Sequence, residues 1–533
     1  MALLNGKIVT LGCVDGAEAV AIKGDRILAV GTVDQVRNLI GQETIVLQLN
    51  GKTVVPGFID SHCHVSGAGT TMVFEVDVRD AQSIDDVVGV LRDKGRQLPE
   101  GRWILGRNYD DRRLREKRHP TRWDLDKASS KHFIFLQRLD EHMAVVNTKT
   151  LELAGVTRAT ADPVGGMIDR TGDTGEPSGL LKELAQEMIM KFIPYYTIDE
   201  IKRGILSACQ RLAGWGVTSF TDTMVDHDAL VAYQELEREG RMPLRAGVVI
   251  PWLPVHGKSG YGKELKTLGL RTGFGNERLR VVGSKFVADG SMSGWTAALY
   301  EPYSNEPGNY GLMTISRDEL REGVLEAHQA GLRPCIHAIG DKTIDVVLDV
   351  IEEALAKYPV ANHRMRIEHC SLPTPEAITR IKRLGVLPSS AIGFLYELGS
   401  AHLLGLGRER IKHYLPHRTY RDQGIVSVGH SDWMVTSAEV AQQIYGAVTR
   451  KSYLGETIGG EQAIPVMEAL KLYTTNAAYA SFEEKIKGSI EPGKLADMVV
   501  LDRDILSVPP EEIKSFQVET TIVGGTVVYQ RGN

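Results

Sequence analysis

The chain has 533 residues, of which 42% are hydrophobic and 24% are charged, and its formal net charge is −6. This balance is typical of a soluble globular protein without a nucleic-acid-binding surface, and no apolar run approaches the roughly 20 residues that span a bilayer. Residues 1–6 lack the regions of a signal peptide and the five cysteines are too scattered for a disulfide framework, so we expect a cytoplasmic protein that binds neither nucleic acid nor membranes.

The two ends of the chain share a pattern of short β-type runs separated by turns. Residues 26–30 near the start and 520–523 near the end are examples. Each set is too small to enclose a hydrophobic core alone. We therefore expect residues 1–55 and 486–533 to pair into one small β-sandwich domain.

Residues 56–485 change to apolar strands that alternate with helical stretches, which favours an α/β fold with a parallel sheet or barrel. Strands are predicted at 217–221, 244–249, 281–286, 333–337, 364–369 and 425–429, and helices at 316–329 and 343–357. The long mixed stretch from about 75 to 185 separates the first strand from the next convincing one. We interpret it as an insertion that follows the first strand and covers the active site.

Two histidines, His62 and His64, directly follow an apolar strand and a Pro-Gly pair. Side chains two apart in a strand point to the same side, so both imidazoles could chelate one divalent ion. The alternative is a pair of surface histidines in a turn.

Further candidate ligands stand at the ends of later strands. His337 and His369 each close a predicted strand, Lys285 lies late in its strand, and Asp432 follows residues 428–431. Taken singly, each has an ordinary structural explanation, such as a hydrogen-bonded histidine, a helix cap or a salt bridge. The carboxyl ends of the strands of a β/α barrel form one face, however, so the ordered set predicts a metal centre there.

These motifs resemble those of the amidohydrolase superfamily, and within it the amidohydrolase-3 group of N-substituted formamide deformylase-like metal-dependent hydrolases. The resemblance covers nearly the whole chain. It is carried by residues 56–64, 140–142 with Asn147, 175–180, 285–291, 337–341, 368–369 and 491–501.

The resemblance implies a TIM-like (β/α)8 barrel and two divalent ions, expected to be Zn²⁺. His62, His64 and Asp432 would hold one ion, His337 and His369 the other, and a carbamylated Lys285 would bridge them. A metal-bridging hydroxide would attack the substrate, with Asp432 as the proton shuttle. The implied reaction is hydrolysis of an amide or related C–N bond of a small molecule, by an enzyme that is expected to be a homodimer.

The same ligands could serve other reactions, because one scaffold hosts many chemistries. Deamination, lactone or ester hydrolysis, decarboxylation and isomerisation stay open at this point. A non-catalytic relative is a further alternative, although such proteins typically lose metal ligands.

Positions at which this sequence departs from the amidohydrolase-3 pattern are candidates for residues that determine substrate specificity. Asp140-Glu141-His142 resembles an Asp-Gly-His motif, so His142 is a candidate catalytic contact to the substrate or its oxyanion, and Asp140 and Glu141 are candidate substrate contacts. Trp295 stands where the group has arginine, and His430 stands where glycine is expected. A Trp295 side chain that faces the site would replace a cation by an apolar wall, so we expect an apolar or aromatic substrate. His430 is a candidate substrate contact, and a purely structural place is its alternative.

Overall fold

The computed structural model describes residues 1–533 except 13, 112, 140–142, 164–165, 256–257 and 533. The chain divides into two compact units, one of Met1–Ser66 with Ala208–Asn533 and one of Gly67–Ser207. Among the described residues, no helix combines the length and the apolar character needed to cross a bilayer.

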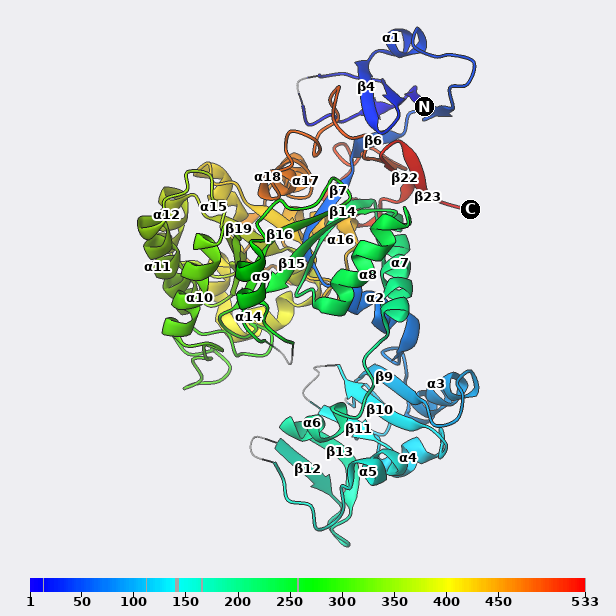
Figure 1. Ribbon diagram of the computed structural model, residues 1–533, viewed down its shortest axis with the longest axis vertical. Coiled ribbons are helices and arrows are strands. Elements are labelled where there is room, and N and C mark those ends of the chain that lie inside the picture. The colour runs from blue at the N-terminus through cyan, green and yellow to red at the C-terminus, as the bar shows by residue number, and fades with distance from the viewer. Residues whose placement is uncertain (13, 112, 140–142, 164–165, 256–257, 533) are drawn as a thin grey trace. The chain divides into compact units, whose positions relative to one another are not determined.

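The larger unit contains an eight-stranded parallel sheet that curls into a nearly closed barrel, with helices outside the strands (Figure 1). The sheet order follows the chain order, and the last strand returns beside the first. The predicted TIM-like barrel is therefore confirmed. Its strands are β7 (Phe58–Cys63), β14 (Val217–Thr223), β15 (Arg245–Pro251), β16 (Leu279–Val287), β17 (Pro334–Ala338), β18 (Arg366–His369), β19 (Leu387–Ala391) and β20 (Val428–His430).

The helices between these strands are amphipathic, so each packs one apolar stripe inward. In α11 (Asp341–Lys357), for example, Ile344, Val347, Leu348 and Ile351 are all buried and recur at helical spacing. Other long helices include α7 (Ile198–Gly214), α8 (His227–Arg238), α10 (Arg317–Gln329), α12 (Pro375–Leu384) and α16 (Val440–Thr449), while α13 (Gly393–Glu397) and α14 (Gly399–Arg410) follow β19.

Both ends of the chain build the small β-sandwich beside the barrel. The strand β6 pairs antiparallel with β21, so Val54 lies opposite Val500 and both are buried in a shared core. One sheet contains β4 (Arg26–Gly31), β3 (Ala19–Lys23), β1 (Ala2–Leu4) and β5 (Val46–Gln48). The other contains β2 (Lys7–Ile8), β6 (Thr53–Pro56), β21 (Met498–Leu501), β22 (Val518–Val523) and β23 (Thr526–Gln530).

The smaller unit is the insertion between the first and second barrel strands. Its six-stranded sheet has the order β12-β13-β11-β10-β9-β8 and packs on α3 (Ile84–Arg96), with Leu91, Ile104 and Leu136 in the core. The strands are β8 (Val76–Asp77), β9 (Trp103–Tyr109), β10 (Phe133–Arg138), β11 (Met143–Val146), β12 (Gly166–Arg170) and β13 (Pro177–Glu183). That this insertion covers the active site stays a prediction, as do the domain boundaries at 55/56 and 485/486.

Candidate metal centre

The end of β7 and the segment after β20 bring His62, His64 and Asp432 together. Backbone hydrogen bonds from Asp432 N to His62 O and from His64 N to Trp433 O join the two segments. Oδ1 of Asp432 lies 3.4 Å from Nε2 of His62 and 3.2 Å from Nε2 of His64. These spacings match the edge of a tetrahedron whose ligands lie about 2.0–2.1 Å from a central zinc ion.

Hydrogen bonds on the far side of each ring show which nitrogen carries the proton. Nδ1 of His62 lies 2.7 Å from Oε2 of Glu368, and Nδ1 of His64 lies 3.1 Å from the carbonyl oxygen of Thr223. Because a carboxylate and a carbonyl only accept, each Nδ1 donates and each Nε2 presents a lone pair.

Asp432 Oδ1 therefore faces two lone pairs, and it is buried without a hydrogen-bond donor among the described residues. A carboxyl group is ordinarily ionised at pH 7, so Oδ1 of Asp432 is an anionic oxygen. An ionised oxygen and two lone pairs this close repel one another unless a cation lies between them. The residues present therefore fit a divalent metal.

Lys285 in β16 borders the same cluster. Its Nζ lies 3.3 Å from Nε2 of His62, and its side chain is buried. Burial lowers the pKa of Lys285 because it disfavours the charged ammonium.

His337 and His369 lie next to each other at the ends of β17 and β18, with ring centroids 4.5 Å apart. Nε2 of His337 lies 3.0 Å from the carbonyl oxygen of Gly290, so Nδ1 is left as its lone pair. The ring of His369 lies 5.1 Å from that of His62, and burial lowers the pKa of both rings well below the ordinary value. Neutral rings are the form that binds metals.

Unusual backbone conformations also gather at these strand ends. His369 has φ 67°, Cys370 has φ 43° and Asp432 has φ 56°. Such positive values are costly for residues other than glycine, and they concentrate at functional sites where the surrounding structure enforces them.

The structure brings His430 into the cluster. Its ring is stacked on His62, with centroids 4.7 Å apart and planes 17° apart, and it meets His369 at 5.2 Å. Nε2 lies 3.1 Å from the carbonyl oxygen of Ser389, whereas Nδ1 is buried without a partner among the described residues. Burial lowers the pKa of His430 to about 4, so this ring is neutral at pH 7.

The other predicted substrate contacts are placed differently. Trp295 packs against α14, where a Cβ on Gly405 would come within 3.2 Å of Trp295 Cδ1. Its backbone φ is 56°. Asp140, Glu141 and His142 lie outside the described residues.

Sequence reasoning missed Glu368, Arg366 and Phe394. Arg366 and Glu368 are charged residues inside the fully buried strand β18, which is itself a signal because such strands are normally apolar. Burial alone raises the pKa of Glu368, but Arg366 outweighs burial and brings it to about 2. Phe394 of α13 stacks on His369, with centroids 5.7 Å apart and planes 7° apart, and supplies an apolar wall beside the cluster.

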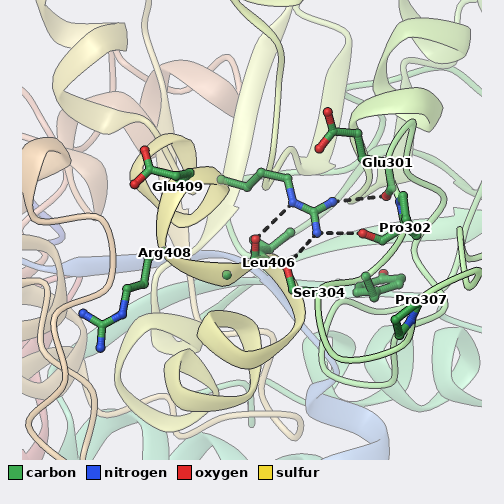
Figure 2. Close-up of a pocket in the computed structure, with 10 residues that line it drawn as sticks. Glu301, Pro302, Ser304, Pro307, Leu406, Arg408 and Glu409 are labelled. Atoms are coloured by element: carbon green, nitrogen blue, oxygen red, sulfur yellow. Dashed lines mark hydrogen bonds between the residues drawn. The ribbon is translucent and has the colours of Figure 1, made fainter.

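A separate hollow of about 500 Å³ lies between the 301–307 loop and the end of α14 (Figure 2). Arg410 joins these two segments by donating to the carbonyl oxygens of Glu301, Pro302 and Leu406. None of the predicted metal ligands lines this hollow, so it is distinct from the histidine cluster. Its lining residues are Glu301, Pro302, Tyr303, Ser304, Pro307, Leu406, Gly407, Arg408, Glu409 and Arg410.

Comparisons with known proteins agree with this fold. Residues 46–529 match the model of the amidohydrolase family. The chain is 29% identical over 531 residues to a putative amidohydrolase, YtcJ, of Bacillus subtilis (strain 168), covering 97% of both chains. It is 29% identical over 547 residues to an N-substituted formamide deformylase of Arthrobacter pascens, covering 99% of this chain and 98% of that protein.

Solved structures lead to the same family. An uncharacterized metal-dependent hydrolase from Pyrococcus horikoshii OT3 superposes with a TM-score of 0.79 at 29% identity, covering 96% of this chain and 99% of the other. The predicted resemblance is confirmed: the chain belongs to the amidohydrolase family of metal-dependent hydrolases.

Proposed function

We propose that this hydrolase cleaves an amide or related C–N bond of a small molecule at a centre of two Zn²⁺ ions. The observation that carries the proposal is the set of facing acceptors formed by His62, His64 and Asp432. Oδ1 of Asp432 lies 3.4 Å from Nε2 of His62 and 3.2 Å from Nε2 of His64, with no proton between them. These residues would hold one ion, and His337 and His369 would hold the other.

Lys285 is proposed to bridge the two ions as a carbamate. Its lowered pKa favours the neutral amine, which is the form that attacks carbon dioxide. The new N–C bond forms as nitrogen loses a proton, and the product carries anionic oxygens where an ammonium would repel cations. The 3.3 Å separation from His62 Nε2 supports this position for the bridge.

Divalent ions held by these residues would polarise the substrate carbonyl and acidify the attacking water. Asp432 would accept the proton of that water on its carboxylate. It would then deliver the proton to the leaving nitrogen. His142 is proposed to contact the substrate or its oxyanion, with Asp140 and Glu141 as further substrate contacts.

The proposed substrate is apolar or aromatic. The ring of Phe394, which stacks on His369, supports this proposal, and the role of Trp295 as a substrate contact stays a prediction. His430 would contact the substrate from beside His62. We further propose a cytoplasmic homodimer, and the buried free thiols of Cys63, Cys209, Cys335 and Cys370 suit a reducing compartment.

The test measures metal content per chain and then turnover of N-acyl, N-formyl, carbamate and lactone substrates with and without a chelator. Two ions per chain and chelator-sensitive amide cleavage are expected. One ion would remove the bridging role of Lys285. Turnover of lactones alone would show that the reaction is lactone hydrolysis and not hydrolysis of an amide. Release of ammonia from amino-substituted rings alone would show that the reaction is deamination.

A further inference from the structure

We propose that Glu368 is a positioning residue that, together with Arg366, sets the orientation and the tautomer of His62 for metal binding. This inference rests on the proposed function, because it treats His62 as a metal ligand. Glu368 does not contact the atoms that would hold the ion. It contacts Nδ1 of His62, on the opposite side of the ring from Nε2.

The contact geometry is specific. Oε2 of Glu368 lies 2.7 Å from Nδ1 of His62, and neither side chain is exposed. Because the carboxylate can only accept, the proton stays on Nδ1 and the lone pair stays on Nε2. Nε2 is the atom that faces Lys285 and Asp432.

Arg366 holds Glu368 in place. The two residues are two apart in β18, so their side chains leave the same side of the strand. Nε of Arg366 lies 2.7 Å from Oε1 of Glu368, and Nη2 donates to Glu368 Oε2 at 2.8 Å. Nη2 also reaches the carbonyl oxygen of Ser61 at 2.8 Å and Oγ of Ser389 at 3.0 Å, which links β18 to both β7 and β19.

Stability alone does not explain a fully buried Arg–Glu pair. Removing two charges from water is expensive, and apolar residues of similar volume often stabilise a core equally well or better. The pair does, however, place an ionised carboxylate against Nδ1 of His62, whose Nε2 lies in the proposed metal centre. Carboxylates that accept from metal-binding histidines are known to raise ligand basicity and fix the ring.

The test compares the zinc affinity of metal-free protein, measured by competition with a chromophoric chelator, and the visible spectrum of Co²⁺-loaded protein. Glu368→Gln is expected to weaken zinc binding by about 10- to 100-fold and to shift the Co²⁺ spectrum. The matched control is Asp497→Asn, which breaks another buried carboxylate–arginine pair, with Arg245, and should leave both readouts unchanged.

A double variant, Arg366→Met with Glu368→Gln, separates positioning from charge imbalance. If Glu368 only neutralises Arg366, the double variant regains wild-type zinc affinity, and the proposal fails. If Glu368 positions His62, the double variant stays weak, and this arm decides the question even where Glu368→Gln alone does not fold. Zinc affinity of Glu368→Gln within twofold of wild type also overturns the proposal.

His62→Ala distinguishes the two levels of inference. Loss of zinc in His62→Ala without loss in Glu368→Gln would overturn only the positioning role. Unchanged zinc binding in His62→Ala would instead overturn the proposed metal centre.

Discussion

Nε2 of His64 lies 3.2 Å from Oδ1 of Asp432, and neither atom has a proton to share, because the ring donates its Nδ1 proton toward Thr223. The two residues come from the ends of the first and the last barrel strands. Their mutual repulsion acts on the seam where the barrel closes, so a bound cation should stabilise the fold as well as serve the reaction.

Removal of metal should therefore lower the melting temperature of the protein. A ligand present at 100 times its dissociation constant stabilises the folded state by about 2.7 kcal/mol, so the difference should be readily measured by calorimetry. Zn²⁺ added back to the chelated protein should restore the transition, whereas Mg²⁺ should not, because it disfavours imidazole ligands. Identical melting curves with and without chelator would contradict a stabilising cation at the seam.

Asp432→Asn should retain metal and lose most turnover. The amide keeps one oxygen near His62 and His64 but cannot take up a proton, and a positioned acid–base group typically contributes about 10²- to 10⁴-fold. Metal content and kcat at saturating substrate are the two measurements. Full activity in the variant would rule out Asp432 as the proton carrier.

The positions of the strand-end residues could be predicted from the sequence because each follows an apolar run and a parallel barrel gathers such ends on one face. The pairing of His62 with Glu368 could not be predicted from the sequence. Glu368 reaches His62 across the barrel interior, and no local pattern records which strands face each other there. The packing of Trp295 against α14 could not be predicted either, because it joins segments far apart in the sequence.

Asn147 shows the opposite case, where a local signal suffices. Its side chain accepts from Thr150 N at the start of α5 (Thr148–Ala154), as expected for an Asn at a helix N-cap. It also donates to the carbonyl oxygens of Ser129 and His132 and is fully buried. Its part in the family motif is therefore explained by folding of the insertion, with no need for a role in catalysis.

Asp124 in the insertion should make local stability depend on pH. Burial alone raises its pKa, but hydrogen bonds from Arg118 and Thr121 at the start of α4 (Arg122–Asp126) outweigh burial and lower it to about 2. Since the folded-state pKa lies below the unfolded value, the stabilisation is present above about pH 4 and is lost as the pH falls toward 2. After discounting for solvent screening we expect about 1 kcal/mol.

Hydrogen exchange of α4 amides in the full chain measures this effect. The α4 amides of Asp124→Asn should exchange faster than those of wild type at pH 6, and the gap in opening free energy should fall to about half at pH 3 and close only below pH 2. Asp173→Asn, at an exposed turn of the same unit, is the control and should show no gap at either pH. If the gap in opening free energy persists unchanged at low pH, then the effect comes from the helix-capping hydrogen bonds of Asp124 and not from its negative charge.

Lys285→Met should reduce the metal content of purified protein from two ions per chain to one or none, because methionine cannot form the bridging carbamate. Wild-type protein supplied with ¹³C-bicarbonate should show a carbamate carbon by NMR that the variant lacks. The control is Lys487→Met: Lys487 is also buried but pairs with Glu483 at 2.7 Å, and Arg280 remains 3.2 Å from that carboxylate. This control should keep both ions. If Lys285→Met still binds two ions, then Lys285 of the wild type is only a buried amine beside His62, and another group must bridge the metals.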